Sequence, residues 1–118
     1  METGPALAAA AGAFLVICSG ASAGEVVPAA ARQQALVHMV RQDCGSCHGM
    51  RLTGGLGPAL TREALADRPL ESLVATTLHG RPGTPMPGWS SMLSEAEARW
   101  IARQLQAGFP DEAKAAAK

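Results

Sequence analysis

Two cysteines and a histidine lie within one five-residue segment and could together hold a metal-containing cofactor. The segment is Cys44-Gly45-Ser46-Cys47-His48, in a chain that has only three cysteines. Two thiols three positions apart can form thioether bonds to the two vinyl groups of one porphyrin, and the adjacent imidazole can then ligate the iron. The spacing therefore predicts one covalently bound haem c, attached through Cys44 and Cys47, with His48 as an axial iron ligand.

Three other roles for these residues remain as alternatives. A thioredoxin-like dithiol needs a βαβ unit around the two cysteines, and the sequence shows no strand alternation. A structural zinc site takes four ligands, and the only further candidates are His38 and His79. A disulfide between Cys44 and Cys47 would close a small, strained ring. Zinc is the main alternative to haem.

The first 23 residues have most features of an export signal. A small and apolar stretch over residues 6–17 is followed by Ala21-Ser22-Ala23, a pattern that predicts cleavage after Ala23. The stretch is too short to span a bilayer comfortably. It has no Lys or Arg before it and carries Glu2 instead, so an uncleaved anchor remains an alternative. We expect an exported, periplasmic bacterial protein without stable membrane insertion after cleavage.

The composition limits the mature chain to one small domain. Without residues 1–23 the chain has 95 residues, with ten basic and nine acidic side chains. A chain of this length buries only a modest core, to which a porphyrin would add a large apolar body. The near-zero net charge gives no sign of nucleic-acid binding. We expect a monohaem domain over residues 24–110 and a disordered, Ala- and Lys-rich tail over residues 111–118.

The mature sequence is typical of an all-α domain with loops rich in Gly and Pro. The first helix is predicted over residues 30–43, so that Cys44 lies at its end. Its apolar face at three-and-four spacing consists of Ala35, Leu36, Met39 and Val40. A short helical segment is predicted after Thr61, which is a suitable N-cap.

Two more helices are predicted towards the C-terminus. Pro69 suits the first position of a helix that carries Leu70, Leu73, Val74, Thr77 and Leu78, and Gly80 should end it. Ser94 and Glu97 form a capping box at the start of the last helix, which should end near Ala107-Gly108. Its buried side is expected to consist of Trp100, Ile101 and Leu105.

Met86 is the predicted second axial ligand of the haem iron. Pro85 and Pro87 flank it, and prolines on both sides exclude a regular helix and stiffen an extended loop. Such a loop can hold a thioether against a flat ring and limits rearrangement between oxidation states. His79 and Met92 are the alternative ligands, and the remaining alternative is an iron whose sixth position is open.

Further side chains are candidates for contacts with the haem propionates. Arginine matches a carboxylate in bidentate geometry and an indole N–H can donate to one, which suggests Arg51, Arg81 and Trp89. Each of the three has an alternative role as a solvent-facing or packed side chain. We expect His38 to be a surface or packing residue of the first helix, and His79 to complement a helix C-terminus.

In this order of features the chain resembles class I c-type cytochromes: an N-terminal helix, Cys44 to His48, Gly57-Pro58-Ala59-Leu60, a methionine loop and a C-terminal helix. The resemblance implies a small monohaem fold in which the first and last helices cross, with loops around the haem. It also implies that the carbonyl of Pro58 accepts a hydrogen bond from His48, and that Leu60 lines the haem pocket. Contact is then expected between Leu36 or Val40 and the last helix at Trp100 or Ile101.

The longer run from residue 43 to residue 89 is similar to the cytochromes c-55X of denitrification gene clusters. This resemblance implies an electron carrier that cycles between Fe(II) and Fe(III) and donates electrons to the nitrite reductase with haems c and d1. A role in d1 haem maturation or delivery is the alternative. With His48 and Met86 both on the iron, no position is open for substrate, so we expect a monomeric carrier and not an enzyme. A ligand-binding haem protein with an open sixth site remains the other alternative.

Overall fold

The computed structural model describes residues 1, 3–5, 12 and 25–112. Within them the chain forms helices and no strand, which confirms the all-α prediction. The elements are α1 (Ala30–Met39), η1 (Val40–Cys44), α2 (Gly45–His48), α3 (Arg62–Leu65), α4 (Leu70–His79) and α5 (Glu95–Ala107). The predicted cleavage site after residue 23 and residues 113–118 of the predicted tail lie outside the described residues. No helix in the described part of the chain combines the length and apolar character that crossing a membrane requires.

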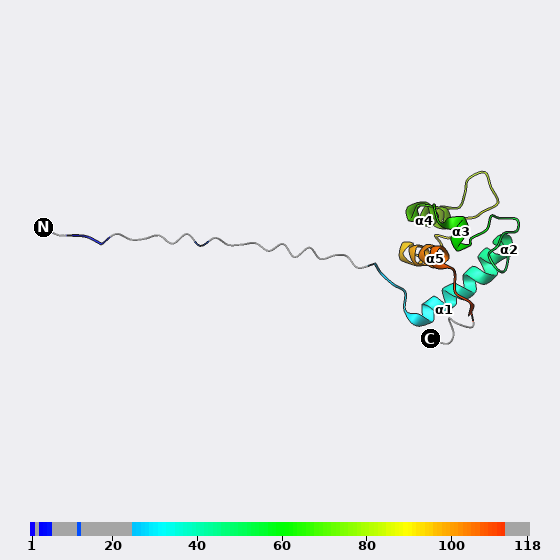
Figure 1. The fold of residues 1–118 in the computed structure, drawn as a ribbon, viewed down its shortest axis with the longest axis horizontal. Helices are drawn as coiled ribbons and strands as arrows, with labels where there is room; N and C mark the ends of the chain where they lie inside the picture. The colour runs from blue at the N-terminus through cyan, green and yellow to red at the C-terminus, as the bar shows by residue number, and fades with distance from the viewer. Residues whose placement is uncertain (2, 6–11, 13–24, 113–118) are drawn as a thin grey trace.

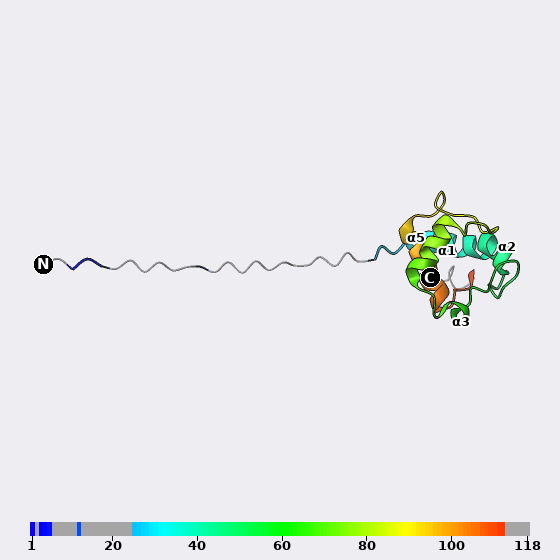
Figure 2. The same cartoon turned by 90° about the horizontal axis from the view of Figure 1, so that it is seen from above.

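The three N-terminal elements follow one another without a break. In Figure 1, α1 leads directly into the π-helical turn η1 and then into α2 at one end of the molecule. Figure 2 shows the same end from above, with the long loop after α4 extending towards α2. Elements α4 and α5 pack against each other, and α3 packs against α5. The cofactor-binding motif therefore lies at the end of the first helical segment, beside two loops.

The buried face of α1 differs by one position from the predicted one. Leu36, Val37 and Val40 are fully buried, whereas Ala35 is exposed and was wrongly placed on this face. An alanine at the edge of an apolar stripe can lie on the buried or the exposed side of a helix at little cost. Burial of a valine removes more apolar surface from water and is therefore more favourable. The face of α1 that is buried is therefore the one that contains the larger side chain of Val37.

The predicted end of the first helix at residue 43 is also wrong. The chain remains helical through the motif, and the N–H of Gly45 donates to the carbonyl of Val40, five residues earlier. Gly45 has ordinary right-handed helical angles, with φ −61°. The glycine that ends the helix is Gly49, whose φ of +88° suits a residue without a side chain. His48 is thus the last residue of α2, directly before the chain turns.

The remaining helix ends follow their sequence signals closely. The side chain of Thr61 accepts a hydrogen bond from the N–H of Ala64, as expected for an N-cap. Pro69 occupies the N-cap of α4 and not its first helical position, a shift of one residue, and Gly80 ends that helix with φ +71°. Ser94 and Glu97 form the predicted capping box of α5.

One hydrophobic core joins the first and last helices. Trp100, Ile101 and Leu105 of α5 are buried in the same hydrophobic cluster as Leu36 and Val40, so the first and last helical segments share one core. A second group consists of Val74, Ala98 and Ala102. The two alanines lie four residues apart, on one face of α5, and their small size lets α4 approach closely. The core thus fixes α1, and with it the motif at the end of this helical segment, relative to α5.

Candidate haem site

The imidazole of His48 is held in one orientation. Its side chain is buried, with 8% exposed, and its Nδ1 lies 2.6 Å from the carbonyl oxygen of Pro58. A carbonyl oxygen can only accept, so Nδ1 carries the proton and Nε2 keeps the lone pair that a metal needs. The hydrogen bond expected between these two residues is therefore confirmed. It leaves Nε2 as the nitrogen available to iron.

Two glycines allow the loop after the motif to lie directly against it. A Cβ atom on Gly57 would lie 2.8 Å from Nδ1 and Cε1 of His48, and one on Gly55 would lie 2.8 Å from the carbonyl oxygen of Cys47. The N–H of Gly57 donates to that same carbonyl at 2.8 Å, and the N–H of Gly54 donates to the carbonyl of His48 at 2.8 Å. The flat side of the imidazole is therefore packed against backbone without any side chain between them.

The two cysteines differ in burial. Cys44 is half-buried and Cys47 is exposed, and neither forms a disulfide. Burial above all, and then the nearby Asp43 and Cys47, raise the pKa of the Cys44 thiol to about 11. In the described part of the chain, no group of three or more His, Cys, Asp and Glu side chains is arranged to hold a metal ion.

The loop that contains Met86 is closed by its own hydrogen bonds. The N–H of Arg81 donates to the carbonyl of Met86 at 3.3 Å, so the two ends of the loop tip are joined. The hydroxyl of Thr84 donates to the carbonyl of Arg81 at 2.7 Å and lies 3.4 Å from the N–H of Met86. Met86 itself is half-buried. These bonds hold the backbone that carries the thioether in one conformation.

The base of this loop is as tightly packed as its tip. A Cβ atom on Gly80 would lie 2.6 Å from the carbonyl oxygen of Met86, and one on Gly88 would lie 2.6 Å from the carbonyl oxygen of Leu78. Trp89 N–H donates to the carbonyl of Thr77 at 3.0 Å, which ties the returning chain to α4. The loop therefore leaves and rejoins the helical body at one closely packed crossing.

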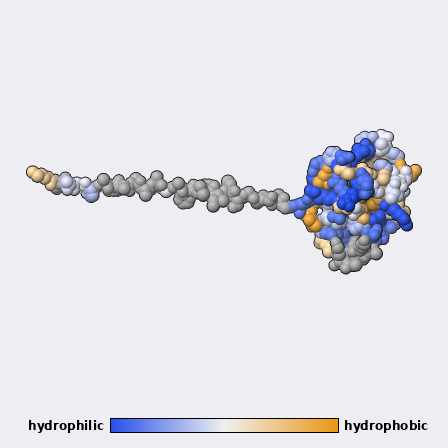
Figure 3. Space-filling model, in the orientation of Figure 1, coloured by the Kyte–Doolittle hydropathy of each residue, from blue (hydrophilic) through white to orange (hydrophobic). Residues whose placement is uncertain are grey.

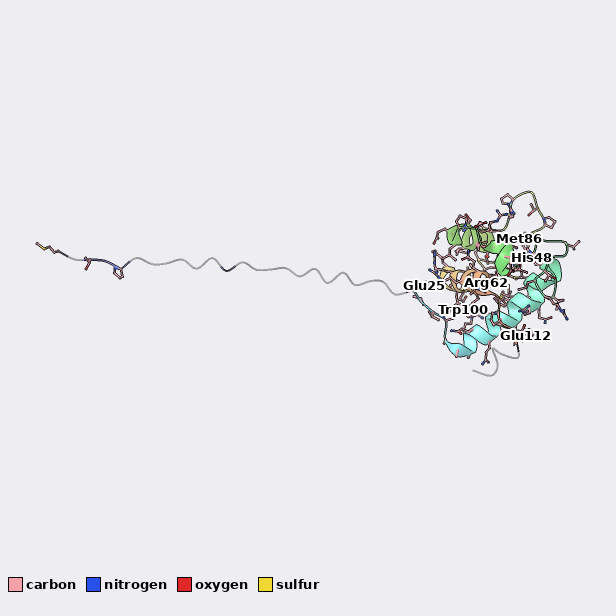
Figure 4. All side chains as sticks on the ribbon, viewed as in Figure 1. Glu25, His48, Arg62, Met86, Trp100 and Glu112 are labelled. Atoms are coloured by element: carbon pink, nitrogen blue, oxygen red, sulfur yellow. The ribbon has the colours of Figure 1, made fainter. Side chains whose placement is uncertain are left out.

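His48 and Met86 lie at the same end of the molecule, on segments almost forty residues apart in the sequence. Figure 4 shows His48 on α2 and Met86 on the loop that follows α4. The alternative ligands are placed differently: Met92 is 57% exposed shortly before α5, and His79 is exposed at the end of α4. Of the candidates for the second axial ligand, Met86 is thus the one on a closed, ordered loop near the motif.

The other predicted residues occupy varied positions. Leu60 and Trp89 are half-buried and pack against the main core. Arg51 lines a cavity of about 330 Å³ together with Arg41 and Leu60. Arg81 is exposed at the base of the Met86 loop. Contacts of Arg51, Arg81 and Trp89 with haem propionates remain predictions.

His38 lies on the surface of α1, as expected. Its Nδ1 is 3.1 Å from a carboxylate oxygen of Glu112, and its side chain is 69% exposed. His79 lies in the last turn of α4, where a histidine can complement the negative end of the helix dipole. Neither histidine takes part in a cluster with Cys44 and Cys47.

Several residues that shape the site had no assigned role in the sequence. Gly55 and Gly57 could have been recognised from the spacing of glycines in Gly54-Gly55-Leu56-Gly57, which permits a close approach of two backbones. Leu52 is 2% exposed and has a φ of +61°, which is unusual for leucine. No pattern in the sequence predicts this backbone conformation. The hydroxyl of Thr84 bonds to the backbone of Arg81 and Met86, and these bonds form only when the loop is folded.

The donor set fits a covalently held haem. Two unpaired thiols and one buried imidazole come from consecutive turns of the same helical segment, and the backbone of Gly57 packs closely against the imidazole ring. The His48 ring nitrogen opposite the Pro58 hydrogen bond is free to ligate iron. This combination suits a c-type haem better than a zinc ion, which needs four ligands, because no group of three or more His, Cys, Asp and Glu side chains among the described residues is arranged to hold a metal ion.

Comparison with known proteins identifies the family. The family model for cytochrome c oxidase, cbb3-type, subunit III matches residues 30–103. Cytochrome c55X of Stutzerimonas stutzeri is 60% identical over 83 residues, which make up 70% of this chain and 74% of that protein. The structure of the c-type cytochrome NirC has 61% sequence identity and a TM-score of 0.67, and the match covers 68% of this chain and 94% of that one.

A weaker similarity extends to a larger protein. A dihydro-heme d1 dehydrogenase of Pseudomonas aeruginosa is 36% identical over 74 residues, which make up 63% of this chain but only 15% of that enzyme. The cofactor of the present chain is covalently attached haem c, as in the family of its relatives. The chain belongs to the family of c-type cytochromes that the matching model describes, and within that family to the cytochromes c55X.

Proposed function

We propose that this cytochrome is a periplasmic one-electron carrier of denitrification, which donates electrons as a monomer to the nitrite reductase with haems c and d1. The observation that carries the proposal is the arrangement of His48 and Met86. One is a fixed imidazole with a free Nε2, and the other is a thioether on a closed loop at the same end of the molecule. Two such ligands leave no iron position open for substrate.

Each residue of the site has a defined part in this proposal. Cys44 and Cys47 would hold the haem through thioether bonds, and His48 and Met86 would ligate its iron. The haem supplies a one-electron Fe(II)/Fe(III) couple when bound. Pro58 fixes the ring of His48 and makes its ligating nitrogen more electron-rich through the Nδ1–H bond. Leu60, half-buried against the core, lines the haem pocket.

The Met86 loop suits a carrier because an electron is exchanged quickly only if little has to move. The bonds between Arg81, Thr84 and Met86 hold the ligand-bearing backbone in one conformation, which would limit its rearrangement between oxidation states. The soft thioether favours ferrous iron and so raises the reduction potential compared with a second imidazole. The protein thereby favours acceptance of an electron and then presents it to a partner.

Export and the partner follow from other features. The pattern Ala21-Ser22-Ala23 after an apolar stretch supports cleavage and passage to the periplasm. The relatives named cytochrome c55X support a place in denitrification. Redox partners associate briefly through small interfaces, and a net charge near zero gives little long-range steering. The contact surface itself must then provide the recognition.

The test is to mix the reduced holoprotein with purified nitrite reductase and nitrite in a stopped-flow spectrometer. Reoxidation should be second order, with a rate constant on the order of 10⁵–10⁷ M⁻¹s⁻¹. A control without reductase measures spontaneous oxidation by nitrite. Reoxidation no faster than in that control would contradict the proposed donor role.

The similarity to a dihydro-heme d1 dehydrogenase supports a second candidate. In that case the ferric cytochrome would accept electrons when a partner enzyme oxidises a dihydro-haem d1, and two cytochrome molecules would be reduced for each two-electron oxidation. Mixing ferric cytochrome with such a dehydrogenase and its substrate distinguishes the two roles. Reduction there, without electron transfer to nitrite reductase, would favour maturation.

A further inference from the structure

We propose that a cavity between η1, α3 and the chain after α5 binds a small anion that carries two or more negative charges on carboxylate or phosphate groups. Its volume of about 330 Å³ lies at the lower end of the range for ligand sites in proteins. We call it the arginine cavity, because Arg41, Arg51 and Arg62 line it. This site lies apart from the cysteine-histidine motif, so it does not depend on the proposed electron partner.

The arginine cavity is distinct from the space in which a haem would bind. None of its lining residues belongs to the motif over residues 44–48 or to the loop over residues 80–89. A haem held between His48 and Met86 would therefore lie outside it. Leu60, which is expected to line the haem pocket, also lines the cavity, so the two sites are neighbours.

Arg41 brings a positive charge with available donors to the arginine cavity. Its side chain is 14% exposed, and its guanidinium carbon lies 5.4 Å from the centre of the Phe109 ring. Its hydrogen bonds to the carbonyls of Phe109 and Pro110, at 3.1 and 3.0 Å, both start from Nη2. Across the residues that the structure describes, no fully buried side-chain nitrogen is without a partner, so Nε and Nη1 are reachable from outside. These two nitrogens can donate to an anion in the cavity.

The lining of the cavity has more positive than negative side chains. It contains three guanidinium groups and one carboxylate, that of Glu63, which leaves an excess of two positive charges. Guanidinium groups bind the paired oxygens of carboxylates and phosphates especially well. A ligand with two or more negative charges on such groups would balance the excess.

Other carboxylates near Arg41, in space or in sequence, do not line the cavity. Asp111 lies 3.6 Å from its Nη2, and because the Asp111 side chain is 71% exposed, water screens most of its charge. Glu112 pairs with Nδ1 of His38 at 3.1 Å. Asp43 is exposed two residues after Arg41, and residues two apart on a helix do not face each other. The cavity therefore keeps its positive character.

The surface around α3 suits a polar ligand. Figure 3 shows that the face seen in Figure 1, which includes α3, is largely hydrophilic (blue), with hydrophobic (orange) surface in small patches. Thr61, the N-cap of α3, lines the cavity, and its hydroxyl accepts a hydrogen bond from Ala64 N–H at 3.3 Å. The proton of that hydroxyl remains available for a bound anion. Leu52 and Phe109 add apolar walls, against which an organic anion can pack.

Isothermal titration calorimetry of the oxidised holocytochrome measures this binding. Sodium pyrophosphate and sodium citrate serve as probes, each at an ionic strength held constant with sodium chloride, so that screening is equal. We expect saturable binding with a Kd on the order of 1 mM or lower for at least one probe. Binding of either probe supports the site, and the tighter one shows whether phosphate or carboxylate is the preferred group.

Arg62→Gln should weaken binding about tenfold, because a charge-assisted hydrogen bond is lost from an exposed position. Arg41→Gln should weaken it at least as much. Glu63→Gln should tighten binding about two- to fivefold, since a repelling carboxylate is removed. Arg68→Gln is the matched control, because Arg68 is also exposed but does not line the cavity. Arg51 is left unchanged, since a haem propionate is its other predicted contact.

The anion site is overturned if neither probe binds saturably up to roughly 10 mM, ten times the expected Kd. Binding by Arg62→Gln equal to that of wild type, or an equal loss in Arg68→Gln, would also overturn it. The haem absorption spectrum of each variant checks that the fold is intact, and Arg62→Gln decides the result even if Arg41→Gln does not fold. Electron transfer from wild type to nitrite reductase is measured separately, and its absence would contradict the donor role while the anion site stands.

Discussion

The Nδ1 atom of His48 donates a hydrogen bond of 2.6 Å to the carbonyl oxygen of Pro58, while Gly57 lies against the same imidazole ring. One short loop thus fixes both the rotation and the tautomer of the histidine. The free nitrogen faces away from that bond and is the one available to iron. Ring orientation depends on a backbone carbonyl and a missing side chain, not on a charged partner.

Gly57→Ala should disturb this arrangement, because its Cβ would lie 2.8 Å from the ring atoms of His48. Overpacking of this kind costs about 1–3 kcal/mol. We expect the free energy of unfolding of the ferric holoprotein, measured in denaturant, to fall by that amount. The NMR signals of the axial histidine should shift as well.

Gly45→Ala provides the matched control within the same motif. Gly45 is helical with φ −61°, and a Cβ there would lie 3.5 Å from its nearest neighbour, the Cα of Met50. This substitution should leave stability unchanged or raise it by up to about 1 kcal/mol, since alanine favours a helix over glycine. Equal destabilisation by both variants would show that contact with the His48 ring is not the cause.

Met86→Ala should remove the sulfur ligand from the iron. The weak red absorption band that thioether ligation gives ferric haem should disappear, and the reduction potential should fall by on the order of 100 mV. The protein should also gain rapid binding of cyanide and carbon monoxide. Met92→Ala is the control, since Met92 is exposed before α5. Loss of the band in Met92→Ala, and its persistence in Met86→Ala, would reverse the assignment of the ligand.

Ser94→Ala tests the contribution of the capping box. The Ser94 hydroxyl accepts from the N–H of Glu97 at 3.1 Å, and the Glu97 carboxylate accepts from the N–H of Ser94 at 2.9 Å. Loss of an N-cap costs about 1 kcal/mol, which corresponds to a fall in Tm of about 4–8 °C in a domain of this size. Thermal unfolding of the holoprotein measures it. A Tm within 1 °C of wild type, taken as roughly the precision of such a scan, would contradict this role.

The sequence predicted the second half of the fold well, because its signals there are local. Ser94 with Glu97, Thr61 and Gly80 each act within one turn of backbone, and each lies within a residue of the helix end it was expected to mark. The same holds for Cys44 and Cys47, whose spacing directly matches the chemistry of the porphyrin. Local hydrogen bonding and fixed offsets can be recognised without a structure.

The features that the sequence did not reveal depend on distant contacts. Val37 is buried in place of Ala35 because its larger side chain fills the core that α1 shares with α5, and this core exists only in the folded chain. Leu52 adopts φ +61° because its carbonyl accepts from Leu60 N–H and its side chain is buried, both of which exist only in the folded chain. Gly45 resembles a helix terminator, but Gly49 is the glycine that ends the helix.

Stability should fall in acid partly through Glu97. The hydrogen bond from Arg32, at 2.6 Å, and then the backbone of Ser94 hold the pKa of Glu97 below its ordinary value. A carboxylate whose pKa is lower in the folded state stabilises the fold above the unfolded pKa, about 4.3. That stabilisation is lost as the pH falls through the folded pKa.

Glu97→Gln should therefore be less stable than wild type at pH 6 and lose less stability between pH 5 and pH 3, a window of about one unit on each side of the unfolded pKa. Denaturant unfolding of the holoprotein across this range measures the difference. Glu63→Gln is the control, because Glu63 is exposed and lies outside the ion pairs found among residues 25–112. A parallel pH dependence in wild type and Glu97→Gln would contradict the role of this ion pair.

Every role proposed for this chain requires one haem bonded to both cysteines of the motif in an exported protein. Intact mass and peptide mapping of the protein purified from the periplasm test it directly. We expect a chain that begins at Gly24 and carries the mass of one haem on the peptide from Cys44 to His48. A mature chain with unmodified Cys44 and Cys47 would contradict the claim, whatever its other properties.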